Sequence, residues 1–128
     1  MKGNSETYLP DLWQERTSLL LGEDALSVLR ASSVVVAGLG GVGAYAAEMM
    51  ARAGIGRIVI VDSDRVSANN KNRQLLATDS NIGKMKTEVM ASRLKDINPG
   101  LEIVSVSEYL TEDNIGALLS PAGRADFL

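Results

Sequence analysis

The amino-acid sequence contains no cysteine and no histidine, and aromatic residues make up only 4% of its 128 positions. Without cysteine the chain can form no disulfide, zinc–thiolate site or thiol nucleophile, and it fits a reducing compartment. Without histidine it also lacks the usual acid–base group of neutral pH. Residues 1–10 show no signal-peptide pattern, and no apolar run approaches the roughly 18 residues of a membrane-spanning helix. We therefore expect a soluble cytoplasmic protein that does not contact a membrane.

Positive charge is also in short supply, because 13 Lys and Arg residues stand against 16 Asp and Glu residues and the net charge is −3. The chain as a whole therefore does not attract nucleic acid, and any RNA partner would have to be held by a local basic patch. Hydrophobic residues, mainly Leu, Val, Ile and Ala, make up 45% of the chain. This aliphatic composition favours an α/β protein with one core over a β-sandwich or a disordered chain.

Runs of β-branched residues alternate with helix-like segments along the chain. We predict strands over residues 33–37, 57–62 and 101–106, and helices over residues 44–53, 84–97 and 112–119, after two helical segments between residues 11 and 29. This alternation predicts a Rossmann-like, doubly wound parallel sheet with helices on both faces, whose ligands bind beyond the carboxyl ends of the strands. We assign residues 1–31 to an N-terminal helical segment and residues 32–128 to a nucleotide-binding domain.

The last residues, Asp126–Leu128, resemble the opening of a fourth strand. A sheet that stopped there would leave backbone groups unpaired at its edge. We therefore expect the chain to be the N-terminal part of a longer protein and to have little or no enzymatic turnover alone.

A glycine-rich turn between the first predicted strand and the next helix carries Gly38, Gly40, Gly41 and Gly43. Glycines allow a tight turn and let backbone N–H groups approach a phosphate at the positive end of a helix. Asp62 lies 19 residues beyond Gly43 at the tip of the second predicted strand, where it can accept hydrogen bonds from ribose hydroxyls. Together these features predict a nucleotide site, although the pattern fits NAD as well as ATP.

Polar residues that follow Asp62 favour ATP. The carboxylate of Asp64 suits a metal or a polar tether, although a solvated turn aspartate is the alternative. The segment 69–74 clusters amide and cationic donors suited to phosphate oxygens, whereas an ordinary surface loop would explain only its polarity. Lys84 and Lys86 begin a predicted helix, where cations are unfavourable unless an anion binds, although an exposed charged face is the alternative.

The motifs of the chain, in this order, resemble the ubiquitin-activating-enzyme-like superfamily that includes ThiF and MoeB. The matching strings are Glu15-Arg16-Thr17, Gly38-Leu39-Gly40-Gly41-Val42-Gly43, Arg52-Ala53-Gly54-Ile55-Gly56, Asp62-Ser63-Asp64, Asn72-Arg73-Gln74, Gly83-Lys84-Met85-Lys86 and Ile97-Asn98-Pro99. The N-terminal strings, with Leu21-Gly22-Glu23-Asp24-Ala25-Leu26 and Ala44-Tyr45-Ala46-Ala47-Glu48, most resemble the tRNA threonylcarbamoyladenosine dehydratase branch. The resemblance covers nearly the whole chain.

The resemblance implies an enzyme that binds ATP and Mg²⁺ and activates a carboxylate by adenylation. It implies that Gly41 and its neighbours contact the ATP phosphates, that Asp62 contacts the ribose, and that the remaining contacts come from a polar set. That set comprises Arg73 and Lys86 as catalytic cations, with Asp64, Asn70, Asn72 and Gln74 as further binding residues. The magnesium ligand is expected beyond Leu128.

The same resemblance implies a homodimer in which Arg16 enters the partner's site. The double-arginine pattern of the family is not reproduced, because Leu19 and Leu20 follow instead, and an ordinary surface arginine is the alternative. By resemblance, the activated carboxylate belongs to the threonyl group of a modified adenosine in tRNA. The alternative acceptor is the C-terminal glycine of a ubiquitin-like sulfur carrier. An NAD-binding oxidoreductase or a nucleotide-binding module is the alternative of another class.

Overall fold

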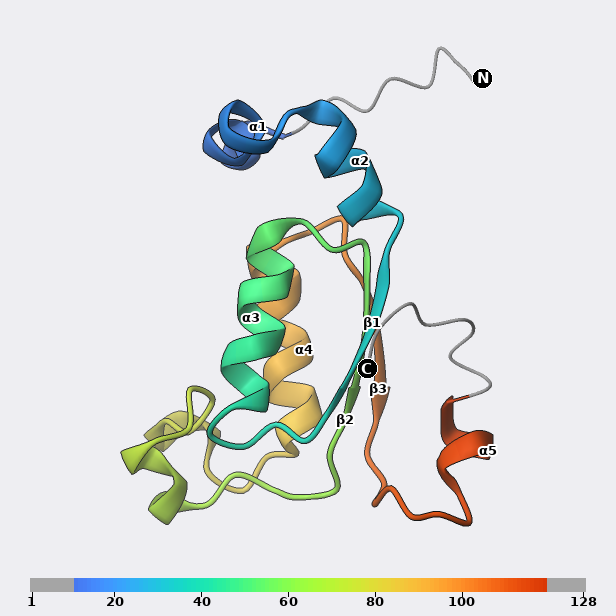
Figure 1. Cartoon of the computed structure of the whole chain (residues 1–128). Coiled ribbons are helices and arrows are strands. Elements are labelled where there is room, and N and C mark those ends of the chain that lie inside the picture. The colour runs from blue at the N-terminus through green and yellow to red at the C-terminus, as the bar shows by residue number, and fades with distance from the viewer. Residues whose placement is uncertain (1–10, 120–128) are drawn as a thin grey trace.

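A computed structural model describes residues 11–119 of the chain, so the strand expected at Asp126–Leu128 lies outside the described residues. Three strands and five α-helices alternate in the described part, as the sequence predicts (Figure 1). The elements in chain order are the 3₁₀ turn η1 Leu12–Gln14, α1 Glu15–Leu21, α2 Glu23–Arg30, β1 Ser33–Ala37, α3 Gly43–Ala53, β2 Arg57–Val61, η2 Ala68–Asn72, η3 Asp79–Asn81, α4 Lys86–Ile97, β3 Glu102–Val106 and α5 Ile115–Leu119.

The three strands form one parallel sheet in the order β1-β2-β3. Their ends are level, because Ser33 pairs with Arg57, which in turn pairs with Glu102. The β-branched run of β2 is buried on both sides of the sheet, with Ile58 and Ile60 in one apolar cluster and Val59 in the other. A continuous apolar strand is what a sheet covered on two faces requires, and the predicted α/β class is confirmed.

Helices α3 and α4 lie together on one side of the sheet, and α5 lies on the other side (Figure 1). The inner face of α3 is a row of alanines, Ala44, Ala47 and Ala51, none of which is exposed to solvent. These small side chains let the helix lie close to the strands, which are themselves lined with branched residues. The N-terminal helices join this core through Leu26, which is 1% exposed.

The prediction of one helix over residues 84–97 was wrong at its start, because α4 begins at Lys86. The backbone before it is paired with the segment after β2, where the Val66 N–H donates to the Lys84 carbonyl at 2.8 Å and Arg65 forms an antiparallel bridge with Met85. The last helix also begins later than predicted. Thr111 and Asn114 exchange backbone–side-chain hydrogen bonds across a turn, so that α5 starts at Ile115.

The other element boundaries lie close to those predicted. The second strand ends at Val61 rather than at residue 62, and the polar loop that follows contains the two short 3₁₀ turns η2 and η3. Gly22 separates α1 from α2 with a φ of +86°. Within residues 11–119, no helix is long and apolar enough to cross a membrane.

Candidate nucleotide-binding site

The glycine turn folds back tightly at the carboxyl end of β1. The Gly38 N–H donates to the Val61 carbonyl at 2.7 Å, and Gly38 has a φ of +95°, a conformation that favours glycine. A Cβ atom added at Gly43 would lie 1.7 Å from the Gly38 carbonyl oxygen. The start of α3 therefore presses against the end of β1, and only glycine fits at position 43.

This turn presents unpaired backbone donors at the start of α3. Within residues 11–119, the N–H groups of Gly40, Gly41, Val42 and Gly43 donate no hydrogen bond. The first N–H groups of a helix have no partner within it, and together with the helix dipole they attract an anion. The turn is therefore suited to hold a phosphate group.

Asp62 links this turn to the end of β2. Its Oδ2 atom accepts the Leu39 N–H at 2.8 Å, and its Oδ1 atom accepts the Asp64 N–H at 2.8 Å. Each carboxylate oxygen retains a second acceptor position, which leaves Asp62 able to accept hydrogen bonds from a ribose. The sequence motif predicts the ribose contact but not the bond to Leu39, which holds the glycine turn in place.

The carboxyl ends of the strands surround a hollow of about 300 Å³ beside Asp62. Its lining residues are Ala37, Gly38, Val61, Asp62, Ser63, Asp64, Glu108, Tyr109 and Leu110. Sequence reasoning missed the last three residues, because they follow β3 and belong to no recognisable motif. A level parallel sheet brings the ends of its strands together, so the position of the segment just after β3 was the available signal.

Lys86 is the buried cation of the site, since it is only 5% exposed at the first position of α4. Its Nζ atom lies 4.0 Å from Asp64 Oδ2, and its N–H donates to the Asp64 carbonyl at 3.0 Å. A lysine is costly to bury at the positive end of a helix with one distant counter-charge. The arrangement brings Lys86 and Asp64 together as predicted and suits the binding of a further anion.

Arg73 lies beside the glycine turn. A Cβ atom added at Gly41 would lie 3.8 Å from Arg73 Cγ. The Arg73 Nη1 atom donates to Asn72 Oδ1 at 2.9 Å, which orients the guanidinium group and gives Asn72 a positioning role. The planar guanidinium has further donors available for phosphate oxygens.

The remaining amides of the predicted set are buried. Asn70 is 8% exposed, and its Oδ1 atom accepts the Ser67 N–H at 3.0 Å, so this side chain closes a turn. Gln74 is 7% exposed and lies under the turn, where a Cβ atom added at Gly40 would be 3.9 Å from its Nε2 atom. The Gln74 Oε1 atom is buried and has no hydrogen-bond partner within the described residues.

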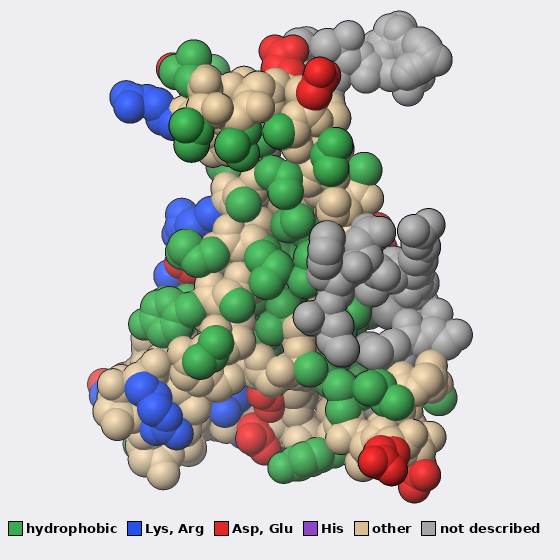
Figure 2. Space-filling model, viewed as in Figure 1, with side chains coloured by type: hydrophobic (Ala, Val, Ile, Leu, Met, Phe, Trp, Pro, Cys, Tyr) green, Lys and Arg blue, Asp and Glu red, His purple; other side chains and the backbone are tan. Residues whose placement is uncertain are grey.

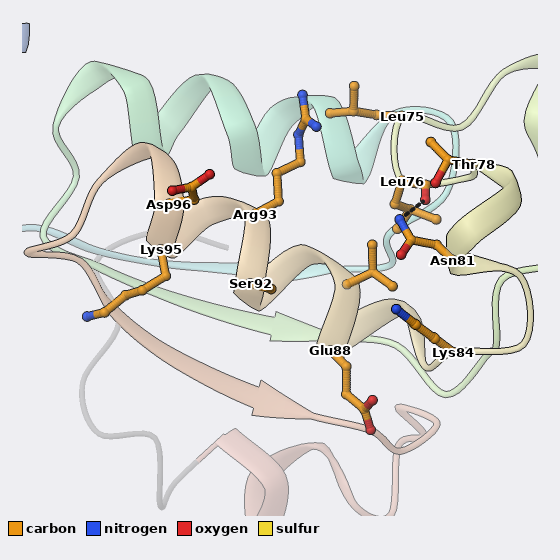
Figure 3. Close-up of a pocket in the computed structure, with 11 residues that line it drawn as sticks. Leu75, Leu76, Thr78, Asn81, Lys84, Glu88, Ser92, Arg93, Lys95 and Asp96 are labelled. Carbon is orange, nitrogen blue, oxygen red and sulfur yellow. Dashed lines mark hydrogen bonds between the residues drawn. The ribbon is translucent and has the colours of Figure 1, made fainter.

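Two predicted cations lie apart from this group. Lys84 lines a separate groove between the loop and α4 (Figure 3). Arg16 belongs to α1, which lies beyond the opposite end of the sheet from the glycine turn (Figure 1). Within one chain Arg16 therefore does not join the site. No group of three or more Asp, Glu, Cys or His side chains that could hold a metal forms among residues 11–119.

Comparison with known proteins places this site in a family. The model of the ThiF family matches residues 14–128. The chain is 42% identical over 115 residues to the tRNA threonylcarbamoyladenosine dehydratase of Escherichia coli (strain K12), covering 88% of the chain and 43% of that protein. It is 45% identical over 98 residues to the protein of that name from Bacillus subtilis (strain 168), covering 77% and 39%.

Solved structures agree with these sequence matches. The structure of E. coli TcdA in complex with ATP superposes with a TM-score of 0.82 and 41% identity, covering 88% of the chain and 48% of that structure. E. coli MccB with ATP has a TM-score of 0.76 and 26% identity, covering 92% and 37%. The chain spans about two fifths of the length of the curated relatives. On the family match and these relatives, the chain belongs to the ThiF family.

Proposed function

We propose that this chain is the nucleotide-binding part of an enzyme that uses ATP to adenylate a carboxylate on threonylcarbamoyladenosine in tRNA. The observation that carries the proposal is the row of unpaired N–H groups from Gly40 to Gly43 with Arg73 and the buried Lys86 nearby. This array of donors and cations suits a polyphosphate. The relatives named tRNA threonylcarbamoyladenosine dehydratase, and TcdA bound to ATP, support the choice of substrate and nucleotide.

In the proposed reaction a carboxylate oxygen of the substrate attacks the α-phosphorus of ATP. The bond from that phosphorus to the bridging oxygen of the β-phosphate breaks, so that pyrophosphate leaves and an acyl-adenylate remains. The modified adenosine then cyclises and AMP is released. An ionised carboxylate needs no general base, which fits a chain without histidine.

The protein's contribution to this step is positioning and electrostatic. The glycine turn and Asp62 hold the phosphates and ribose, while Arg73 and Lys86 neutralise charge that builds on the α-phosphate and the departing pyrophosphate. We propose that Mg²⁺ accompanies ATP and supplies further charge neutralisation. Asp64 is the nearest candidate ligand in this part of the chain, and its exposed carboxylate lies 4.0 Å from Lys86 Nζ.

We further propose that the protein acts as a homodimer in the cytoplasm. Large apolar side chains are exposed on the N-terminal helices and along the outer side of α3, and Figure 2 shows hydrophobic groups over both regions. They include Leu12, Leu19, Leu20, Val28, Val42, Tyr45 and Met49. Exposed apolar surface of this kind suits contact with another protein surface. In such a dimer Arg16 would complete the partner's site from outside.

The second candidate acceptor is the C-terminal glycine of a ubiquitin-like carrier. The adenylyltransferase and sulfurtransferase MOCS3 of Aedes aegypti, 46% identical over 86 residues, favours it. ATP–pyrophosphate exchange by the full-length protein separates the two acceptors, because exchange needs the correct carboxylate. We expect tRNA carrying threonylcarbamoyladenosine to stimulate exchange and a carrier protein to have no effect. Stimulation by the carrier alone would refute the choice of tRNA.

A further inference from the structure

Positive charge is concentrated in one segment of this acidic chain. Residues 63–86 contain five Lys and Arg and two Asp, a net charge of +3, whereas the whole chain carries −3 and the remainder therefore −6. Lys and Arg side chains gather over this segment in the lower left of Figure 2. A local basic patch is what an acidic protein needs in order to hold a nucleic acid.

Two of these cations are free of both the nucleotide site and ion pairs. Lys71 pairs with Asp79, Lys86 pairs with Asp64, and Arg73 lies beside the glycine turn. Arg65 and Lys84, by contrast, are exposed and form no ion pair within the described part of the chain. Their charges are therefore available to an anionic partner.

The backbone holds these two residues next to each other. The Val66 N–H donates to the Lys84 carbonyl and the Gly83 N–H donates to the Val66 carbonyl, both at 2.8 Å. The Arg65 guanidinium reaches across this pairing, and its Nη1 atom donates to the Gly83 carbonyl at 3.0 Å. Only one of the five guanidinium N–H donors is thereby committed. Arg65 and Lys84 thus form a fixed pair of cations, which we call the basic corner.

A groove of about 970 Å³ opens beside the basic corner, between the loop and α4. Lys84 lines it from the loop side with Thr78 and Asn81, as Figure 3 shows. The α4 side carries Ser92 and both signs of charge, including the carboxylates of Glu88 and Asp96. The loop side is therefore the side that suits an anion, and it offers hydroxyl and amide groups next to the ammonium group.

We propose that the basic corner and the loop side of this groove bind the phosphate backbone of the RNA substrate, outside the nucleotide site. The choice of RNA over a carrier protein follows from the other exposed side chains of residues 63–86. Ile82 is the only large hydrophobic side chain exposed there. Protein partners need apolar or aromatic anchors, whereas phosphates, sugars and base edges are met by cations, amides and hydroxyls.

The inference rests on the proposed function and is tested separately from it. The full-length protein is compared with the double variant Arg65→Gln/Lys84→Gln. The matched control is Arg52→Gln/Arg57→Gln, which removes the same charge at the opposite end of the sheet. ATP affinity is measured by calorimetry, and the affinity for unfractionated bacterial tRNA is measured over a series of salt concentrations.

We expect the Arg65/Lys84 variant to keep its ATP affinity and to bind tRNA roughly tenfold more weakly at about 100 mM salt, with the slope of log affinity against log salt reduced by about 1.5. The control variant should keep the original slope. An unchanged tRNA affinity and slope in the Arg65/Lys84 variant would overturn the inference, as would weakened binding of a ubiquitin-like carrier with tRNA unaffected. Loss of ATP binding in the unmodified protein would instead refute the proposed function.

Discussion

Replacement of Gly43 by alanine tests how the glycine turn is built. The added Cβ atom would lie 1.7 Å from the Gly38 carbonyl oxygen and 2.8 Å from its carbonyl carbon. To reach even 3.0 Å from that oxygen, the start of α3 or the end of β1 must move by about 1.3 Å. The obstacle is backbone, which cannot rotate away as a side chain can. The whole turn must therefore shift.

The size of the effect follows from this displacement. Overpacking a rigid site costs about 1–3 kcal/mol and occasionally more, and a backbone obstacle places Gly43→Ala at the upper end, about 3 kcal/mol. That is a large fraction of the roughly 5–15 kcal/mol by which a domain is stable. The shift also moves the unpaired N–H groups of the turn, so we expect ATP affinity to fall at least about tenfold.

The assay is urea unfolding followed by circular dichroism, with ATP affinity measured by calorimetry on the folded variants. Two glycines serve as controls. A Cβ atom at Gly116 meets nothing within 4 Å, so Gly116→Ala should unfold at the same urea concentration or a higher one. A Cβ atom at Gly41 would lie 3.8 Å from Arg73 Cγ, so Gly41→Ala should fold normally. Wild-type stability and ATP affinity in Gly43→Ala would refute this account of the turn.

Three further substitutions test other parts of the structure. Glu48 accepts hydrogen bonds from Arg93 and Arg52, and the first of these contributes most to lowering its pKa below 4.5, so Glu48→Gln should lose roughly 1–2 kcal/mol in urea unfolding at pH 7. Because the folded-state pKa is the lower one, the loss should shrink as the pH falls below 4.5, and a constant difference would contradict the assignment. Asp62→Asn should weaken the bond to Leu39 and lower ATP affinity about tenfold by calorimetry, whereas unchanged affinity would argue against its role. Lys86→Met should raise the unfolding temperature of the free protein by scanning calorimetry and abolish its stabilisation by ATP, and a variant that ATP still stabilises would remove Lys86 from the phosphate site.

The regular elements were predictable because local pattern determines them. The β-branched run at Ser33–Ala37 forms a strand with the predicted ends. The glycine turn and Asp62 also lie together as the motif predicts. The start of α4 was not predictable, because the residues before it pair with a segment 18 positions earlier in the chain, as the bond from Arg65 to Gly83 shows. Non-local pairing of this kind leaves no periodic signal in the sequence.

The candidate site divides in the same way. Residue types alone indicated a phosphate site near Arg73 and Lys86, and the structure places these residues beside Gly41 and Asp64 respectively. The burial of Asn70 could not be predicted, because its side chain resembles that of any exposed loop amide until the turn around Ser67 forms. Tyr109 joins the hollow only because the three strands end level with one another.

The central claim is that the glycine turn serves ATP rather than NAD. The most direct test is the unfolding temperature of the purified protein, measured with ATP and Mg²⁺, with NAD and with no nucleotide. At 100 times the dissociation constant, a ligand stabilises the folded state by about 2.7 kcal/mol. We expect ATP with Mg²⁺ to raise the unfolding temperature, Arg73→Ala to reduce that increase, and NAD to have no effect. Stabilisation by NAD alone would contradict the account.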